Sequence, residues 1–478
     1  MSNLQSLAPQ SHSALPQTRM PPLTPGDRFI AGLVLAMLTF WLFGQSVVNI
    51  APNIQQSLGI SNTALSLALS CTPLFCGCFI VIAGGLADRY GLMRLTRIGL
   101  LLSILGSLLL TVTNGSLLLI LGRIIQGLSG ACIMPATLAL VKHYYQGAAR
   151  QRALSFWSIG SWGGSGISSL VGGTLTLWLA WRWIFVLSIL CALVSWVLIR
   201  GVPEHQSPSV AKSMSGDTAG MILFVVVLLG LNLMFSGLLT GSLLILTGVL
   251  CLLASVGVIT LAHRKAATAF IDLSLFRNRP YSGATLSNFL LNTLAGTLLV
   301  TSTYLQEGRG VNAFRTGMLT IGYLLAVLIM IRIGEKVLQR VGAKTPMLYG
   351  PMITAVGVTL MALTFLGDQA YQWGVASGFI LFGLGLGLYA TPSTDTAVCS
   401  APANNTGMAS GVYKMASTLG GAFGLTVSAS MYAAVKATGA GMSIAASAAI
   451  LVNTGCCLLA LLVVWRRVPA NMPLSKAG

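Results

Sequence analysis

Charged residues are scarce in this sequence. Lys, Arg, Asp and Glu together make up 8% of its 478 residues, whereas hydrophobic residues make up 55%. A soluble domain carries about 25% charged residues, so this chain has too few of them to cover the surface of a water-soluble fold. The composition excludes a soluble globular protein and predicts a polytopic membrane protein, with the lipid bilayer as its main partner.

Acidic residues are the scarcest charged class. Nine Asp and Glu stand against 27 Lys and Arg, which gives a formal net charge of +18. In a soluble chain such an excess would suggest nucleic-acid binding. Here the basic residues stand singly in short loops between apolar runs, a pattern typical of membrane topology. We therefore expect no nucleic-acid partner.

Several motifs of enzymes and ATPases are also missing. The nine cysteines form no Cys-x-x-Cys pair and mostly lie inside apolar runs, which argues against a disulfide framework or a metal site. No Gly-x-x-x-x-Gly-Lys-Ser/Thr loop is present, and no embedded His/Cys/acid constellation indicates catalysis. We expect a protein that is not an enzyme, with no metal, no cofactor and no use of ATP.

Long apolar runs, by contrast, are abundant. A helix needs about 20 apolar residues to cross a bilayer. The sequence holds fourteen such runs, at 29–51, 63–86, 96–114, 117–141, 153–178, 181–200, 218–236, 242–262, 282–305, 317–334, 346–367, 373–397, 405–433 and 441–465. With a cytoplasmic N-terminus, 21 of the 27 Lys and Arg fall in the inside loops and tails. This positive-inside bias predicts that both termini are cytoplasmic.

The runs divide into two groups of six, separated by a pair that is plainer and nearly devoid of polar residues. The predicted organisation is a cytoplasmic tail at 1–28, a six-helix bundle at 29–200, cytoplasmic loops with two inserted helices at 201–281, a second six-helix bundle at 282–465 and a cytoplasmic tail at 466–478. The fold class is therefore an all-α membrane protein with 14 transmembrane helices.

Matching polar pairs open the two bundles. Gln45 and Asn49 lie one turn apart in the first run, and Asn288 and Asn292 have the same spacing in the run that opens the second bundle. Residues at i and i+4 share a helix face, and lipid cannot satisfy them. Internal repeats around a polar cavity are typical of secondary transporters. The alternative is that each pair only joins neighbouring helices.

A charged loop framed by glycines follows the second run. In "GGLADRYGLMR", Gly84 and Gly91 permit close backbone approach, and Asp88 is placed to cap a helix or to pair with a basic residue. Arg89 marks the cytoplasmic face. From its chemistry alone, the loop is a turn whose charged residues can bind neighbouring helix ends. We expect it to take part in gating of the transport pathway.

Three segments resemble motifs of one family. The loop just quoted resembles the helix 2–3 motif of the major facilitator superfamily. "LGRIIQGLSGACIMP" resembles the helix 4 motif of that superfamily's drug–proton antiporters, and "WRWIF" at 181–185 is similar to a motif of its fourteen-helix members. The resemblance implies the major facilitator fold, with two six-helix bundles and a two-helix central insertion.

The resemblance also implies a function. Such proteins are proton-coupled multidrug exporters (antiporters), which extrude amphiphilic drugs such as quinolones by alternating access and confer antibiotic resistance. The implied partners are small-molecule drugs and protons, and the implied location is the inner (cytoplasmic) membrane, with multiple passes. Physical arguments alone leave open an importer or permease of a small metabolite, because the sequence determines neither transport direction nor coupling ion.

Arg123 lies inside the helix 4 run, where a cation costs about 2.5 kcal/mol or more. The resemblance implies that it faces the bundle interior and takes part in proton transfer; the alternative is a structural arginine paired with backbone carbonyls. Among the nine acids, Asp395 is the most deeply embedded and Glu335 ends its run. We expect Asp395 first and Glu335 second to carry protons, and the alternative for Asp395 is a plain helix-end residue.

Polar and aromatic residues on the runs predict a substrate cavity. The expected lining residues are Trp41, Gln45, Asn49, Gln126, Trp162, Asn288, Asn292 and Tyr389. Lys414 has three possible roles: it snorkels to the cytoplasmic face, pairs with Asp395, or meets an anionic group of the substrate. Relatives often carry an acid in helix 1, and its absence at Phe43-Gly44 predicts a cavity that tolerates carboxylate-bearing zwitterions better than dications.

Overall fold

The computed structural model describes residues 26–44, 46–47, 50–204, 249, 273–311, 313–402 and 405–470. This part of the chain forms helices joined by turns and contains no strand. The two predicted helices of the central insertion, at 218–236 and 242–262, lie outside the described residues apart from Val249. The predicted domain boundaries therefore stay predictions.

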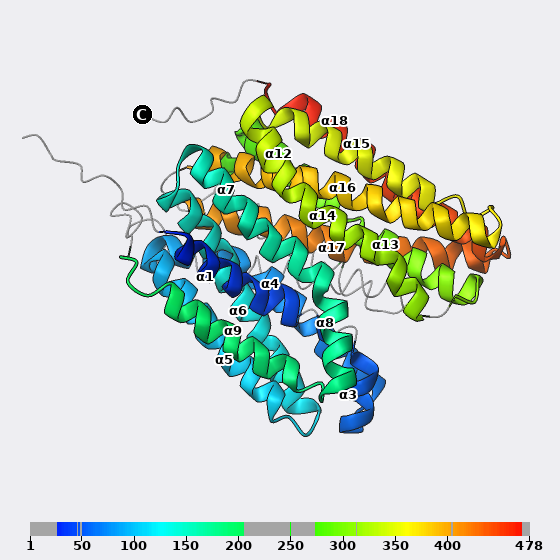
Figure 1. Ribbon diagram of the computed structural model, residues 1–478, viewed down its shortest axis with the longest axis horizontal. Helices are drawn as coiled ribbons and strands as arrows, with labels where there is room; N and C mark the ends of the chain where they lie inside the picture. The colour runs from blue at the N-terminus through cyan, green and yellow to red at the C-terminus, as the bar shows by residue number, and fades with distance from the viewer. Residues whose placement is uncertain are drawn as a thin grey trace, which may run out of the picture.

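The first half of the chain, blue to green in Figure 1, forms one set of helices lying alongside each other. In order they are α1 (Asp27–Leu38), which continues into the π-helix η1 (Thr39–Gly44), α3 (Ala51–Leu58), α4 (Asn62–Tyr90), α5 (Leu92–Thr111), α6 (Ser116–Tyr144), α7 (Gly147–Ser158), the π-helix η2 (Ile159–Gly163), α8 (Gly164–Trp178) and α9 (Trp183–Leu198).

The second half, green to red in Figure 1, forms a second set beside the first. It comprises the short 3-10 helix η4 (Leu273–Arg277), α12 (Arg279–Asn292), α13 (Ala295–Thr303), the π-helix η5 (Tyr304–Gly308), α14 (Ala313–Val341), α15 (Lys344–Met361), α16 (Asp368–Ser400), α17 (Thr406–Ala437) and α18 (Gly441–Arg467).

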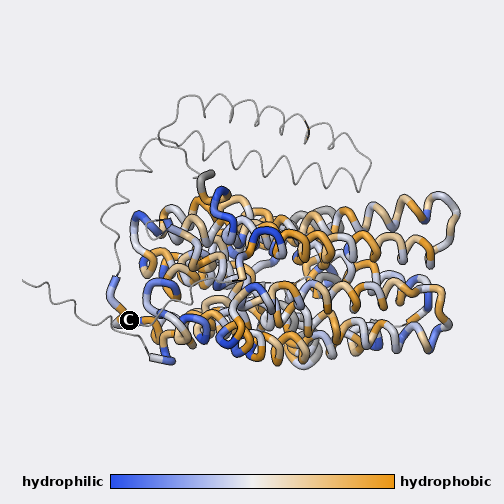
Figure 2. The backbone as a smooth tube through the Cα atoms, turned by 90° about the horizontal axis from the view of Figure 1, so that it is seen from above, coloured by the Kyte–Doolittle hydropathy of each residue, from blue (hydrophilic) through white to orange (hydrophobic). Residues whose placement is uncertain are grey.

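Apolar surface on these helices confirms a membrane protein. Within the described residues, nine helical stretches are long and apolar enough to cross a bilayer, and all the predicted runs outside the central insertion coincide with helices. On α5, Leu101, Leu105 and Leu108 recur at helical spacing and are exposed. Leucines in that position would face lipid, the one solvent in which such exposure carries no cost. Figure 2 shows apolar stretches along the helices, with many of the hydrophilic segments toward their ends.

The predicted run 29–51 is helical over most of its described length. α1 and η1 extend to Gly44, Ser46 and Val47 are again helical, and α3 begins at Ala51, while residues 45, 48 and 49 lie outside the described residues. Pro52 stands in the first turn of α3, where its missing N–H costs nothing. The proline thus favours a helix start at this point.

Glycines let neighbouring helices approach closely within each half. A Cβ atom added at Gly106 of α5 would lie 3.1 Å from the carbonyl oxygen of Gly122 of α6. In the second half, a Cβ atom at Gly357 of α15 would lie 2.7 Å from the carbonyl oxygen of Gly378 of α16. Small residues at such crossings are a common means of packing helices in lipid, where apolar burial gives no net driving force.

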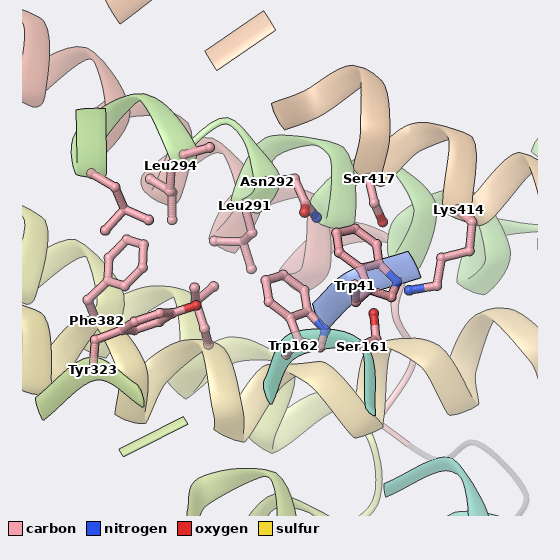
Figure 3. Close-up of a pocket in the computed structure, with 13 residues that line it drawn as sticks. Trp41, Ser161, Trp162, Leu291, Asn292, Leu294, Tyr323, Phe382, Lys414 and Ser417 are labelled. Atoms are coloured by element: carbon pink, nitrogen blue, oxygen red, sulfur yellow. The ribbon is translucent and has the colours of Figure 1, made fainter. Parts of the chain in front are cut away.

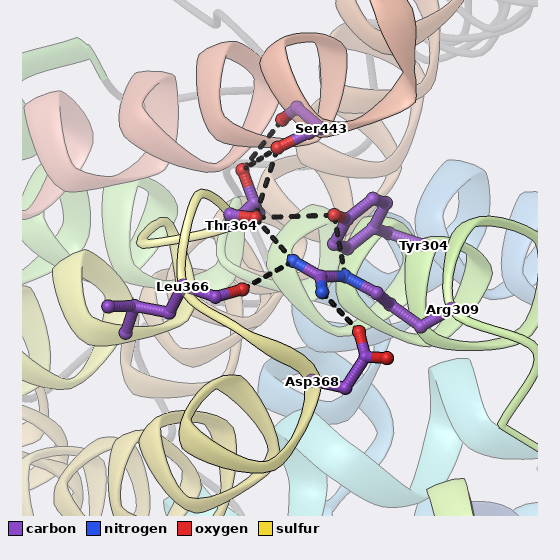
Figure 4. Close-up of polar contacts among 6 residues, drawn as sticks. All are labelled: Tyr304, Arg309, Thr364, Leu366, Asp368 and Ser443. Carbon is purple, nitrogen blue, oxygen red and sulfur yellow. Dashed lines mark hydrogen bonds and ion pairs between the residues drawn. The ribbon is translucent and has the colours of Figure 1, made fainter.

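An arginine ties the α15–α16 turn to η5 (Figure 4). The guanidinium of Arg309 donates to the carbonyl oxygens of Thr364 and Leu366, at 2.6 and 2.7 Å, and to the Tyr304 hydroxyl at 2.9 Å. It also forms an ion pair with Asp368. Because the planar guanidinium group of Arg309 donates to several groups at once, it fixes the turn between α15 and α16.

Candidate functional site between the two halves

A cavity lies between the two halves and has walls from both (Figure 3). It holds about 630 Å³ of empty space, part of which is open to the outside. The first half contributes Trp41, Ser161 and Trp162. The second half contributes a larger set, which includes Asn292, Tyr323, Phe382, Lys414 and Ser417. A site with both halves as walls is accessible to each side of the membrane in turn if the halves rock against one another.

Irregular helix segments position the lining side chains of the first half. Trp41 belongs to the π-helix η1, and Ser161 and Trp162 belong to the π-helix η2. A π-helical turn has one extra residue, which redirects the side chains that follow it, and such turns are frequent at functional sites. Both irregular segments of this half thus lie at the cavity.

The second half repeats this arrangement with a broken helix. α12 ends at Asn292, and α13 begins at Ala295 after a short turn. Leu291, Asn292, Leu294 and Ala295 at this break all line the cavity. Interrupted helices around a central site are typical of transporters built from repeats.

Three of the eight residues predicted for the cavity line it: Trp41, Trp162 and Asn292. Asn288 is buried one turn below Asn292. Its side-chain nitrogen donates to the Ser417 hydroxyl oxygen at 2.6 Å, and its side-chain oxygen accepts from Asn292 at 3.0 Å. The polar pair predicted at the start of the second bundle therefore forms one hydrogen-bonded chain with Ser417.

Two of the other predicted lining residues lie elsewhere in this conformation. Gln126 contacts Arg123, and the Tyr389 hydroxyl lies 2.6 Å from the hydroxyl of Ser287 and accepts from Ser393 at 2.8 Å. The structure places neither on the cavity wall. Gln45 and Asn49 lie outside the described residues.

Lys414 lines the cavity, and the sequence had left three roles open for it. It lies on α17, is 3% exposed and lines the cavity, so it does not snorkel to a helix end. Asp395 pairs with another residue, described below. Contact with an anionic group of the substrate stays a prediction. Ser161, Tyr323, Phe382 and Ser417 were not predicted, because nothing in their local sequence indicates which helix face turns toward the cavity.

Arg123 is buried inside the first half and has carbonyl partners. It donates to the carbonyl oxygen of Gly44 at 2.8 Å, to that of Ala68 at 3.4 Å, and to the side-chain oxygen of Gln126 at 2.9 Å. No described carboxylate contacts it. This geometry matches the structural alternative, because Arg123 pairs with backbone carbonyls, among them that of Gly44, the last residue of η1. Its part in proton transfer stays a prediction.

The two halves are held together at one end of the molecule, on the left in Figure 1. We call it the basic end. It is the end at which α4, α6, α14 and α16 finish, and it carries Arg89, Lys142, Arg150 and Arg340.

Asp88 joins the two halves directly. Its two carboxylate oxygens, at the end of α4, accept from the backbone N–H groups of Gly407 and Met408 at 2.8 and 2.9 Å. These are the first-turn amides of α17, whose own preceding residue Asn405 provides no side-chain cap. An acidic residue of one half thus caps a helix of the other half.

Glycines make this contact possible. A Cβ atom at Gly84 would lie 2.8 Å from the carbonyl carbon of Gly407, and one at Gly411 would lie 2.8 Å from the carbonyl oxygen of Ile80. α4 and α17 therefore touch backbone to backbone at the basic end. Gly91 has φ +112° and ends α4, a conformation that glycine adopts without strain. Arg89 lies over the ring of Tyr90 and is not part of the contact between the halves.

Three further contacts join the halves at this end. The carboxylate of Asp395 on α16 accepts from Arg150 Nε on α7 at 3.0 Å, and both side chains are largely buried. Lys142 Nζ donates to the carbonyl oxygen of Ala401 at 2.6 Å. Arg332 on α14 donates to the Ser155 hydroxyl oxygen at 3.2 Å and pairs with Glu335. Both acids predicted for proton coupling thus belong to this contact region, not to the cavity.

Two helical halves around a shared cavity, joined tightly at one end, define a polytopic membrane transporter. Comparison with known proteins specifies the class further. The model of the Major Facilitator Superfamily matches residues 29–425. The chain belongs to that family.

Curated relatives match along nearly the whole chain. The quinolone resistance proteins NorB of Staphylococcus aureus strains MSSA476 and Newman are each 48% identical to it over 446 residues, which is 93% of this chain and 96% of the relative.

Solved structures share the fold at much lower identity. The proton:xylose symporter XylE has a TM-score of 0.67 at 15% identity and covers 94% of this chain and 98% of its own. The human organic anion transporter MFSD10 has a TM-score of 0.66 at 15% identity, with 92% and 99% covered. A bacterial homologue of ferroportin in an outward-facing state has a TM-score of 0.66 at 11% identity, with 92% and 98% covered.

Removal of the Asp88 carboxylate should loosen the basic end. The test uses a variant whose native cysteines have been replaced and that carries Met408→Cys. This substitution keeps the backbone amide that donates to Asp88, and because the side chain at this position is buried, its reaction with maleimide reports opening. Hydrogen bonds to a charged group contribute about 1.5–3 kcal/mol each. We therefore expect Asp88→Ala to raise the labelling rate at least about tenfold.

Arg89→Ala is the matched control, since Arg89 neighbours Asp88 but lies over Tyr90. It should leave the labelling rate unchanged. Equal rates for Asp88→Ala and the parent protein would show that the cap does not hold the halves together.

Proposed function

We propose that this protein is a proton-coupled multidrug exporter, which extrudes amphiphilic drugs, quinolones among them, by alternating access. The observation that carries the proposal is the cavity with walls from both halves, together with the dense contact between the halves at a single end. The 48% identity to proteins named for quinolone resistance supports efflux over the import of a metabolite. The absence of a phosphate-binding loop from the sequence supports a proton gradient over ATP.

We infer that the basic end faces the cytoplasm. The positive-inside rule supports this orientation, because Lys and Arg gather in the loops and helix ends of that side. Both termini would then be cytoplasmic, in the inner membrane of the cell. In this orientation the described conformation has its cytoplasmic end closed, and its cavity would release drug outward.

Proton coupling would act through the ion pair that joins the halves. The ion pair between Asp395 and Arg150 joins the two halves and would favour a closed cytoplasmic end. A proton on Asp395 would remove one charge, leave Arg150 without its partner and favour opening to the cytoplasm. Release of that proton into the cytoplasm would restore the pair and close the end behind a bound drug. This order gives exchange of drug for proton.

Arg123 would support the same cycle from inside the first half. Its hydrogen bond to the carbonyl oxygen of Gly44 fixes the end of η1, the segment that carries Trp41 into the cavity. We propose that rearrangement of this bond accompanies the change of conformation. Gln126, which accepts from Arg123, would act with it.

Drug accumulation tests the proposed function. Cells that lack their own pumps should hold several-fold less quinolone when they express the protein, because drug leaves against its gradient. Collapse of the proton gradient with an ionophore should abolish the difference. Equal accumulation with and without the protein, or higher accumulation with it, would contradict export; a difference that survives the ionophore would contradict proton coupling.

The substitution Asp395→Asn tests whether Asp395 couples proton movement to export. Asp395→Asn keeps the shape of the side chain but can neither ionise nor exchange a proton. We expect it to lose uphill export, by at least about tenfold in initial rate, while drug binding to the purified protein persists.

Glu335→Gln is the comparison variant. Glu335 is also buried at the basic end, but it pairs with Arg332 of its own helix, so we expect a smaller loss. Normal export by Asp395→Asn, with loss in Glu335→Gln, would transfer the coupling role to Glu335.

A further inference from the structure

The cavity contains a buried cation without a counterion. The Lys414 ammonium lies 4.3 Å from the ring centroid of Trp157 and 5.8 Å from that of Tyr413. Within the described chain it has no hydrogen-bond acceptor and no carboxylate partner. A buried charge in this situation is costly, because ring faces replace only part of its lost hydration. It is therefore prepared to meet an anion.

The acids of the described chain are engaged elsewhere. Each of them pairs with a cation or with helix-end amides: Asp27 with Arg152, Asp88 with α17, Glu204 with the start of α5, Glu307 with Lys436, Glu335 with Arg332, Asp368 with Arg309, and Asp395 with Arg150. None lines the cavity. Among the described residues, therefore, no acid supplies a counterion for Lys414, and we infer that a ligand supplies it.

A second donor in the same cavity lacks a partner. The indole N–H of Trp41 is buried and, among the described residues, has no hydrogen-bond acceptor. Figure 3 shows the Lys414 ammonium directed toward the Trp41 indole, with Ser417 nearby. The Ser417 oxygen accepts from Asn288, so its own hydrogen is available to donate. Two donors without partners and one available hydroxyl thus gather at one end of the cavity.

The other end of the cavity is apolar. Figure 3 places Phe382, Tyr323 and Leu294 together, away from Lys414. The cavity as a whole is amphipathic, with hydrogen-bond donors and a cation at one end and rings and a leucine at the other. Its complement is a flat aromatic molecule with a carboxylate at one edge.

We propose that Lys414 and Trp41 form a carboxylate-binding subsite, which selects amphiphiles with an aromatic body and a carboxylate. The proposal rests on the proposed function, because it assigns the substrate class of the exporter's cavity. The ammonium supplies a charge-assisted hydrogen bond to one carboxylate oxygen, and the indole N–H donates to the carboxylate as well. The Trp157 ring holds the lysine in place when the subsite is empty.

Binding of one quinolone in two forms tests the subsite. The purified full-length protein is titrated with a quinolone that has a free carboxylate and with the methyl ester of the same compound. The ester keeps the ring system but lacks the negative charge. We expect the acid to bind the wild-type protein at least about tenfold more tightly than the ester.

The variants identify the residues. Lys414→Met should weaken binding of the acid about tenfold or more and bring the acid-to-ester affinity ratio near one. Trp41→Phe keeps a ring and removes only the N–H donor, so it should lower the ratio by a smaller factor, about threefold, and it tests the subsite even where the lysine variant does not fold. Lys436→Met, at the exposed far end of the same helix, should keep the wild-type ratio.

The outcomes separate this inference from the proposed function. A wild-type acid-to-ester ratio in Lys414→Met, or equal losses for acid and ester, would overturn the subsite. Binding to the purified protein requires no export. Failure of export in cells would therefore contradict the proposed function and leave the affinity ratio intact, whereas loss of the ratio effect with normal export would contradict only the subsite.

Discussion

The contact between Asp88 and the start of α17 is the constraint on which the closed conformation depends. A helix begins with backbone N–H groups that have no partner within the helix, and they need an acceptor. In α17 that acceptor is a carboxylate from the opposite half of the protein, bonded to the amides of Gly407 and Met408. The first turn of α17 has this cap only while the halves are together. The need of the first amides of α17 for an acceptor thus helps to hold the two halves together.

The other contacts at the basic end share this character. The ion pair Arg150–Asp395 and the bond from Lys142 to the Ala401 carbonyl oxygen each join a group in one half to a group in the other. A buried ion pair has little net effect on stability, but loss of one partner leaves a costly unpaired charge. In the proposed cycle, loss of the Asp395 charge would therefore shift the balance between closed and open states.

The sequence was sufficient to predict most helices of the described residues, the membrane class and the family. Apolar runs of the required length and single basic residues between them follow directly from the bilayer's properties, and the loop around Asp88 has a recognisable pattern. The polar pair Asn288 and Asn292 was also predictable, because its spacing places both residues on one helix face. The two side chains are hydrogen-bonded to each other, and that of Asn288 also bonds to Ser417.

The cavity was only partly predictable. The π-helical segments that place Trp41 and Trp162 contain no proline that would mark them in the sequence. Arg150 and Asp395 are 245 residues apart in the chain, so only the fold brings them together. The direction of Lys414 depends on which face of α17 packs against α4, and composition does not determine this.

The distance between the halves at each end, measured as a function of pH, tests the account most directly. Spin labels at the exposed positions Tyr90 and Val341 report the basic end, and labels at Leu117 and Phe365 report the opposite end. Acidification should lengthen the first distance and shorten the second, and Asp395→Asn should give the acid distances at every pH. Distances that stay constant, or that change in the same direction at both ends, would contradict it.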